Sequence, residues 1–310
     1  MREIKNAGHS AYSKLLDISK TRKEDFSYIL NRYATERFLY RLSISEYSQK
    51  FLLKGASLFL VWKKNNFRVT RDTDLLGIGE YNLERLIDIF KEICLIKTVQ
   101  DDGIVFLSET VSGMPIRAEM EYGGFRINLD CRLHSAKISL QIDIGFGDIV
   151  TPYPEKVSYP ALLDFEAPVL NAYTRYTVVA EKFEAIVRLG MANSRMKDFY
   201  DLWILKNSFE FSPEILQKAI AETFKRRKSE IPEDIPVALT TKFSDDPQKT
   251  AQWKAFVRRT KAETGNLSFS QIVSGISEFI MPVINSIKAK EKAGKRNSSP
   301  TPSLHKKKGL

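Results

Sequence analysis

The seven residues TRDTDLL, numbers 70–76, place Asp72 and Asp74 one residue apart in a stretch that otherwise reads as a strand. Successive side chains of a strand point to opposite faces, so these two carboxylates share a face. Neighbouring carboxylates repel, and burying them without a partner is costly. A cation between them removes the conflict, and oxygen ligands of this kind suit Mg²⁺ or Mn²⁺. The alternative is an Asp-rich surface turn in which Arg71 pairs with Asp72.

The composition is that of an ordinary folded protein. The chain has 310 residues, of which 43% are hydrophobic and 28% charged, enough for one large domain or two small ones. No uninterrupted run of about 18 apolar residues occurs, and the N-terminus has no secretory signal, so we expect no membrane contact. Cys94 and Cys131 lack a metal-binding spacing, which favours a reduced, cytoplasmic setting.

The net charge of +10 comes mostly from the C-terminal end. Residues 285–310 hold eight Lys or Arg and one Glu, a net +7. This segment is rich in Lys, Ser, Pro and Gly, and we expect it to be disordered. It is either a solubilising end or an electrostatic arm for nucleic acid.

Hydrophobic periodicity predicts an α+β protein. A mixed sheet with flanking helices is expected over residues 1–170, a helical domain over 171–288, and a basic tail over 289–310. Strands are expected near 52–53, at 70–77 and three times between 103 and 146. Helices are expected at 11–20, 24–43, 81–96, 176–190, 195–206, 213–226, 248–262 and 268–288. The proline-containing segment 151–170 is expected to join the two domains.

A third acid lies in the predicted strand SLQIDIGF, residues 139–146. Ile142 and Ile144 point to one face of this strand, and Gln141 and Asp143 to the other. If the strand lies beside Asp72 and Asp74, three carboxylates converge, as in sites that hold two metal ions about 3.5–4 Å apart for phosphoryl transfer. Asp148 is the second choice, because it follows an apparent turn.

A turn of small residues, Gly55-Ala56-Ser57, follows a short predicted strand and opens a helix. Small residues let backbone N–H groups approach a phosphate, and the Ser57 hydroxyl adds a donor. Such a turn is also a common structural feature without any ligand.

These motifs together resemble a known family. KGAS (54–57), TRDTDLL, QIDIGFGD (141–148), VVAEKFEAIVRLG (178–190) and RMKDFYDL (195–202) resemble the AbiEii/AbiGii toxins of the DNA polymerase β-like nucleotidyltransferase superfamily. The resemblance spans residues 54–205. One departure is Ala56, where the superfamily usually has Gly or Ser.

The resemblance also marks Lys182. On a helical wheel, Lys182 falls on the apolar side of 176–190, away from a narrow polar face. It either extends its amine past the apolar surface to solvent or points into a cleft and holds a triphosphate. The resemblance assigns a functional acid to RMKDFYDL, which leaves Asp198 and Asp201 open. Either acid could instead pair with Lys182 or Arg195 in a structural role.

Two basic stretches lie on predicted helices, 225–228 and 254–261. Each is usually a solvated face. Trp253 and Phe256 lie among the basic residues of the second stretch. This stretch could bind along an RNA backbone and stack an unpaired base.

The resemblance implies a metal-dependent nucleotidyltransferase toxin of a toxin–antitoxin system, associated with phage abortive infection. Such a toxin transfers a nucleotide from an NTP to an RNA acceptor, the tRNA 3′ end, blocks translation, and is neutralised by a cognate antitoxin. The expected catalytic residues are Asp72, Asp74, Asp143, Lys182, Asp198 and Asp201, with the first three as Mg²⁺ or Mn²⁺ ligands. The expected nucleotide-binding residues are Lys54, Gly55, Ala56, Ser57, Arg71 and Lys182. The alternatives are transfer to a small molecule such as an aminoglycoside or to a protein hydroxyl, or a catalytically inactive binding relative.

Overall fold

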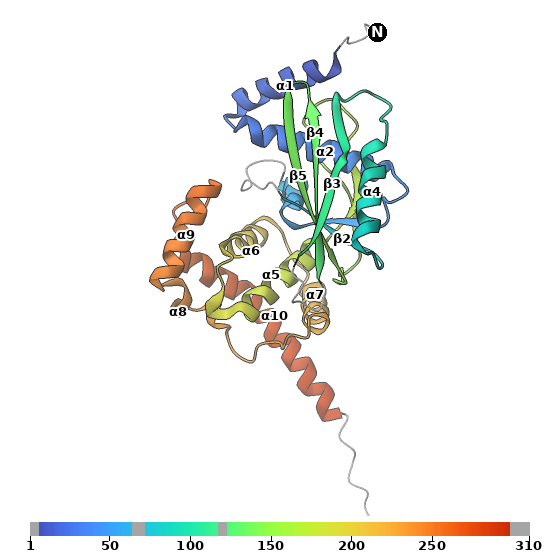
Figure 1. The fold of residues 1–310 in the computed structure, drawn as a ribbon. Helices are drawn as coiled ribbons and strands as arrows, with labels where there is room; N and C mark the ends of the chain where they lie inside the picture. The colour runs from blue at the N-terminus through green and yellow to red at the C-terminus, as the bar shows by residue number, and fades with distance from the viewer. Residues whose placement is uncertain (1–5, 64–71, 117–122, 298–310) are drawn as a thin grey trace, which may run out of the picture. The chain divides into compact units, whose positions relative to one another are not determined.

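The computed structural model describes residues 6–63, 72–116 and 123–297 (Figure 1). Thr70 and Arg71 lie outside these residues, so the predicted nucleotide contact of Arg71 stays a prediction. The chain divides into two compact units. Unit 1 comprises Met1–Val178 and Lys254–Gly265, and unit 2 comprises Val179–Trp253 and Asn266–Leu310. The first division falls eight residues beyond the predicted boundary at residue 170, inside a helix.

The described part of unit 1 contains a mixed sheet of seven strands in the order β3-β4-β5-β2-β1-β7-β6 (Figure 1). The strands are β1 Phe51–Lys54, β2 Thr73–Gly77, β3 Ile104–Ile116, β4 Gly124–Leu133, β5 Ala136–Phe146, β6 Glu155–Ser158 and β7 Val169–Ala172. The two strands that carry the predicted acids, β2 and β5, are parallel neighbours. The predicted α+β fold with a mixed sheet is therefore confirmed.

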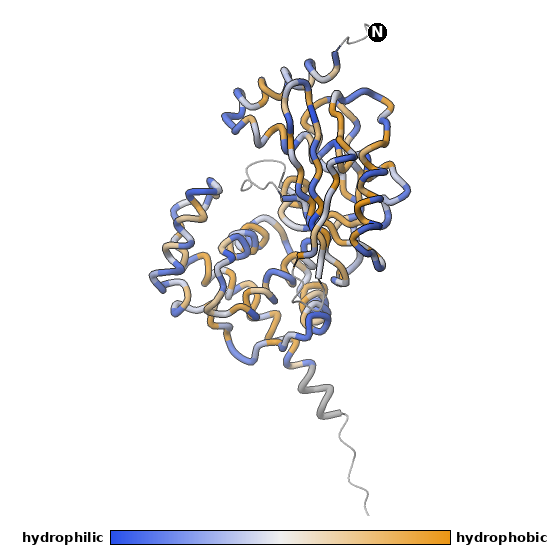
Figure 2. The backbone as a smooth tube through the Cα atoms, viewed as in Figure 1, coloured by the Kyte–Doolittle hydropathy of each residue, from blue (hydrophilic) through white to orange (hydrophobic). Residues whose placement is uncertain are grey.

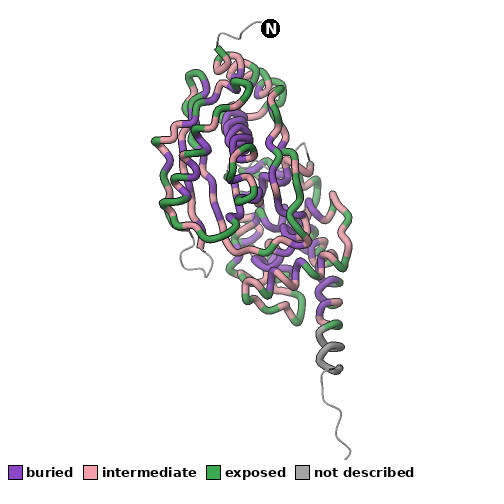
Figure 3. Tube along the Cα trace, turned by 90° about the vertical axis from the view of Figure 1, so that its right-hand side faces the viewer, coloured by how far each residue is buried: buried purple, intermediate pink, exposed green. Residues whose placement is uncertain are grey.

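Two helices of unit 1, α2 (Phe26–Ile44) and α4 (Leu83–Leu95), pack on the same face of this sheet. Phe38 of α2 stacks on Phe90 of α4 at 5.4 Å, and Phe90 meets Phe51 of β1 at 5.8 Å. Hydrophobic residues recur along α4 in Figure 2, whereas α2 is buried nearly all round in Figure 3. The remaining elements of this region are α1 Ala7–Arg22, the 3₁₀ turn η1 Gly55–Ser57 and α3 Leu58–Lys63.

The chain after the sheet is helical, as predicted. Its elements are α5 Arg175–Leu189, η2 Gly190–Ala192, α6 Met196–Ser208, α7 Pro213–Arg226, η3 Val237–Leu239, α8 Thr241–Ser244, α9 Pro247–Thr260 and α10 Phe269–Asn297. Within unit 2, α10 packs against α6, α7 and α8. Two of the three divisions between the units fall inside α5 and α9, and the third follows Gly265.

One helix, α10, passes a length and composition test for a membrane span between Phe269 and Lys290. Polar residues interrupt its apolar ones, so the sequence shows no uninterrupted apolar run there. In the structure, Ile272, Ile276, Ile280 and Ile284 of this helix are fully buried. A core helix of a folded domain passes the same test, and this burial within unit 2 is what a core helix shows.

Three expectations are corrected by the structure. The segment 151–170 is not only a connection, because β6 lies within it and β7 begins in it, and β7 pairs with β1. The expected disorder from residue 289 is wrong up to Asn297, where α10 ends. Base stacking by Trp253 is also wrong: its side chain is only 5% exposed and stacks on Phe269 at 4.7 Å.

Candidate active site

Four charged side chains lie next to one another across the middle strands of the sheet. Strand register pairs Lys54 with Asp74, Asp74 with Asp143, and Asp143 with Arg126. Directly paired residues on neighbouring strands project from the same face. We call this set the charged row: two carboxylates side by side between two cations. The predicted meeting of the Asp74 and Asp143 strands is thus present, and Asp72 belongs to the same face two residues before Asp74.

Arg126 forms two hydrogen bonds to Asp143 through its guanidinium group. Its Nε donates to Asp143 Oδ1 at 2.8 Å and its Nη2 to Oδ2 at 2.9 Å. A two-pronged, charge-assisted pair of this kind is strong and geometrically specific. The Asp143 side chain is only 16% exposed, so the pair is partly shielded from water.

Electrostatics link Asp72 and Asp74 to the same arginine. The pKa of Arg126 is raised above its ordinary value, first by the hydrogen bond to Asp143 and then by the charges of Asp143, Asp72 and Asp74. One terminal atom of the Gln141 amide lies 3.4 Å from Asp72 Oδ1. We assign this atom as the amide oxygen, because it then accepts from Arg126 Nη2 at 3.2 Å and Nε at 3.3 Å, contacts that are shorter and charge-assisted.

The three acids have the right chemistry for Mg²⁺ or Mn²⁺, since all their donor atoms are carboxylate oxygens. Their arrangement fits only in part. Among the residues that the structure describes, no group of three or more Asp, Glu, His or Cys is placed to hold a metal ion. Both oxygens of Asp143 are engaged by Arg126. Asp143 could therefore join a metal site only after Arg126 releases one of its oxygens, and the metal-binding role of all three acids stays a prediction.

The predicted phosphate turn lies directly against Asp74. Gly55 has a φ of +73°, and a Cβ there would lie 2.0 Å from Asp74 Oδ2. Only glycine combines this backbone conformation with this close approach. Ala56 and Ser57 complete the turn η1, and both are buried. The sequence prediction of a small-residue turn opening a helix is confirmed, while its role in binding phosphate stays a prediction.

Lys54, at one end of the charged row, is held by a residue that the sequence analysis ranked second. Its Nζ lies 2.9 Å from Asp148 Oδ2, and the Tyr173 hydroxyl donates to the same oxygen at 3.3 Å. The lysine also passes over the face of Gly145, whose Cβ would lie 3.1 Å from Nζ. Asp148 thus positions a cation beside Asp74.

Lys182 of α5 meets both acids of the RMKDFYDL motif within unit 2. Its Nζ lies 2.9 Å from Asp198 Oδ1 and 2.7 Å from Asp201 Oδ2, and both carboxylates are fully buried. Arg195 Nε also lies 2.7 Å from Asp198 Oδ2, although its N–H is not aligned for a hydrogen bond. The structural pairing that the sequence left open is present. Whether Lys182 also holds a triphosphate stays a prediction.

Arg126 is the main residue that the sequence analysis missed. The signal was available, because β4 and β5 join through the two-residue turn His134-Ser135. Counting outward from Leu133 opposite Ala136 places Arg126 opposite Asp143. A cation facing a candidate metal ligand could therefore have been found by register alone.

Comparisons with known proteins define the class. The family described as "Nucleotidyl transferase AbiEii toxin, Type IV TA system" matches residues 37–274. The protein is thus a nucleotidyltransferase. It belongs to the AbiEii toxin family of type IV toxin–antitoxin systems, which implies an NTP substrate and an antitoxin partner. The family resemblance expected from the motifs is confirmed.

Two solved structures from Helicobacter pylori are similar in fold. JHP933 has a TM-score of 0.46 and 13% identity, covering 85% of this chain and 94% of its own. A second protein, with a provisional nucleotidyltransferase assignment, also has a TM-score of 0.46 and 13% identity, over 82% of this chain and 93% of its own. No curated protein sequence matches the chain.

Proposed function

We propose that this toxin transfers a nucleotide from an NTP to an RNA hydroxyl, at the 3′ end of tRNA, and thereby blocks translation in the cytoplasm. The observation that supports this most is the charged row beside the Gly55 turn. It sets two carboxylates side by side on one sheet face, with Asp72 next to them and a cation at each end. The exposed Lys254, Arg258 and Arg259 of α9 offer positive charge to an RNA backbone.

In this proposal Asp72 and Asp74 hold Mg²⁺ or Mn²⁺, and Asp143 completes the metal site. When bound, the ion neutralises and orients the phosphates of the NTP. Asp143 accepts the proton of the acceptor hydroxyl, whose oxygen bonds to the α-phosphorus as pyrophosphate leaves. Arg126 must first release Asp143 for this role. The η1 turn and Lys54 contact phosphate oxygens, and catalysis is mainly positioning and charge stabilisation.

Lys182 is proposed as a second countercharge for the triphosphate. Asp198 and Asp201 then keep its ammonium group charged and fixed, since both carboxylates lie within 2.9 Å of it. Under this proposal the two acids position the lysine and do not touch the substrate themselves.

The proposal is tested by growth. Expression should arrest growth, and Asp72→Asn or Asp74→Asn should abolish the arrest, because each removes a charge from the predicted metal pair. Asp88→Asn is the matched control, since Asp88 is an exposed acid of α4 in the same unit. Arrest that persists in both substituted proteins at equal expression would exclude these acids as its cause.

A further inference from the structure

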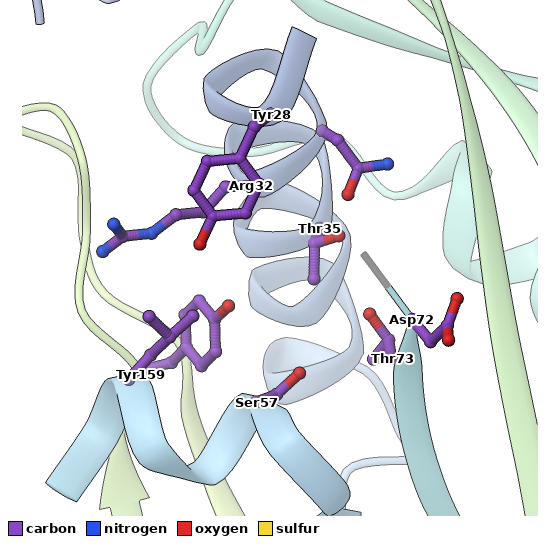
Figure 4. Close-up of a pocket in the computed structure, with 9 residues that line it drawn as sticks. Tyr28, Arg32, Thr35, Ser57, Asp72, Thr73 and Tyr159 are labelled. Atoms are coloured by element: carbon purple, nitrogen blue, oxygen red, sulfur yellow. The ribbon is translucent and has the colours of Figure 1, made fainter. Parts of the chain in front are cut away.

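Two buried polar regions differ in what they can do. The space where α2, the η1 turn and the start of β2 meet is lined by Tyr28, Ser57 and Thr73 among others (Figure 4). It has room for about one water molecule, which is too little for a phosphate group. The buried cation Lys249 of unit 2, in contrast, begins a series of contacts that ends at Lys182.

Lys249 places an ammonium group inside unit 2 without a carboxylate partner among the described residues. It lies in the first turn of α9 and is 5% exposed. Its Nζ donates to the backbone oxygen of Asn193 at 3.0 Å and lies 5.3 Å from the centre of the Phe243 ring. The carboxylate of Asp246 accepts the backbone N–H of Lys249 at 3.0 Å. Burying an ammonium group without a countercharge is costly, so the contact with Asn193 must offset a substantial cost.

Asn193 joins Lys249 to the start of α6. Asn193 is fully buried, and its Oδ1 accepts from the Arg195 N–H at 2.8 Å. Arg195 directly precedes α6, and its backbone oxygen accepts from the Asp198 N–H at 2.9 Å. Its Nε also lies 2.7 Å from Asp198 Oδ2. The Lys249 contact therefore fixes the backbone from which Arg195 and Asp198 project.

The side chains of this loop do not fix its position by themselves. Asn193 Nδ2, Arg195 Nε and Asp198 Oδ2 are buried, and none of them forms an aligned hydrogen bond with a described residue. Asp198 Oδ1 lies 2.9 Å from Lys182 Nζ, so a shift of the loop changes the surroundings of Lys182 directly. Within unit 2, α9 is thus linked to α5 through Lys249, Asn193, Arg195, Asp198 and Lys182.

We propose that Lys249 is a positioning residue for Lys182. This inference rests on the proposed role of Lys182 as a countercharge for the triphosphate. By holding the Asn193 carbonyl, Lys249 keeps Arg195 and Asp198 in place, and Asp198 keeps the Lys182 ammonium group where it binds phosphate. Lys249 itself does not touch the substrate. A charge-assisted hydrogen bond is stronger than a neutral one, so an uncharged side chain of similar length does not replace it.

The test measures the affinity for each of the four NTPs with Mg²⁺ by calorimetry, and the hydrogen exchange of residues 190–198 by mass spectrometry. Lys249→Met removes the charge, and Asn193→Ala removes the acceptor of the Arg195 N–H. Lys242→Met, at an exposed lysine of α8 in the same unit, is the matched control. We expect Lys249→Met to exchange faster in this segment and to bind the preferred NTP on the order of tenfold more weakly. Asn193→Ala should change in the same direction, and the control should behave as the unaltered protein does.

A double variant shows whether the two residues act through the same loop. If they do, Lys249→Met with Asn193→Ala should lose no more NTP affinity than the weaker-binding single variant. Additive losses would overturn the inference. Faster exchange with unchanged NTP affinity would also overturn it, because Lys249 would then only stabilise the loop.

Thermal melts establish that each variant is folded, and Asn193→Ala carries the test if Lys249→Met is not. An unaltered protein that binds none of the four NTPs would contradict the proposed function and this inference with it. An unaltered protein that binds an NTP, beside folded variants that bind it equally well, would contradict this inference alone.

Discussion

At the scale of single residues, Gly55 couples the phosphate turn to Asp74. Gly55→Ala forces a Cβ to within 2.0 Å of Asp74 Oδ2 at a φ of +73°. We expect a loss of stability of about 1–2 kcal/mol from the left-handed backbone. A displaced Asp74 should also lower nucleotide transfer by on the order of a hundredfold.

Gly265→Ala separates the cost of the left-handed backbone from the displacement of Asp74. Gly265 has a φ of +59°, but a Cβ there meets nothing within 4 Å. It should therefore show the backbone cost in a thermal melt and keep its transfer activity. Equal activity in the two variants would show that the contact with Asp74 is irrelevant to catalysis.

Arg126 competes with a cation for Asp143. Arg126→Gln should lower the melting temperature in the absence of Mg²⁺, because a mostly buried carboxylate loses its partner. It should also tighten Mg²⁺ binding on the order of tenfold, since a hydrogen bond to a charged group is worth about 1.5–3 kcal/mol. Calorimetry with Mg²⁺ and melts with and without it measure both effects.

Lys137→Gln is the control, because it breaks an exposed β4–β5 ion pair with Asp130 at 2.8 Å in the same sheet. It should leave Mg²⁺ binding unchanged. If Arg126→Gln binds Mg²⁺ no more tightly than this control, Asp143 is not a metal ligand.

Lys182 neutralises two buried acids in unit 2. Lys182→Met should destabilise the protein by about 3–5 kcal/mol, because the fully buried Asp198 and Asp201 lose the cation that they share. Lys218→Met, which breaks an exposed pair with Glu222, should cost much less. Urea unfolding compares the two. Similar losses would mean that the buried network contributes little to stability.

At the scale of elements, α2 places three charged side chains, Glu36, Arg37 and Arg41, in the core. Arg37 and Arg41 both contact Asp102, at 3.0 and 2.8 Å. Beside them Glu36 accepts the Leu162 N–H at 2.8 Å, and burial raises the pKa of Glu36 from 4.5 to about 7. A carboxyl with a raised pKa holds a proton in the folded state that the unfolded chain has lost.

Because Glu36 binds this proton more tightly in the folded state, the free energy of unfolding depends on pH. Stability should fall as the pH rises from about 4.5 to 7, by up to about 3 kcal/mol, and stay level above that window. Glu36→Gln cannot titrate, so the difference between it and the unaltered protein should change across this window. Urea unfolding at pH 5 and pH 7.5 measures the difference. Parallel losses in both proteins would contradict a titrating Glu36.

Elements with a regular hydrophobic pattern could be predicted from the sequence, and those without one could not. The strands of Asp74 and Asp143 and the helix of Lys182 follow a clear period, so the candidate site was found on the right elements. The strands β6 and β7 have four residues each and lie in or beside a proline-containing segment, which hid them. The helix α2 was predicted, but it has no polar face, so nothing marked Arg37 and Arg41 as buried partners of Asp102.

At the scale of the whole molecule, the protein is an AbiEii-family nucleotidyltransferase whose two units each hold a set of predicted functional residues. Unit 1 contains the charged row and the η1 turn. Unit 2 contains Lys182 with its two acids. The family and the enzyme class could be predicted from short motifs. The motifs did not reveal Arg126, because it lies outside them and is found only by counting the β4–β5 register from the turn His134-Ser135.

The most direct test of the central claim is nucleotide transfer itself. The purified protein is incubated with Mg²⁺, total RNA and each of the four NTPs labelled on the α-phosphate, beside Asp74→Asn and the control Asp88→Asn. We predict label in tRNA-sized RNA with at least one NTP, retained in Asp88→Asn and lost in Asp74→Asn. Label in no RNA with any NTP, or only in protein or small molecules, would contradict the account.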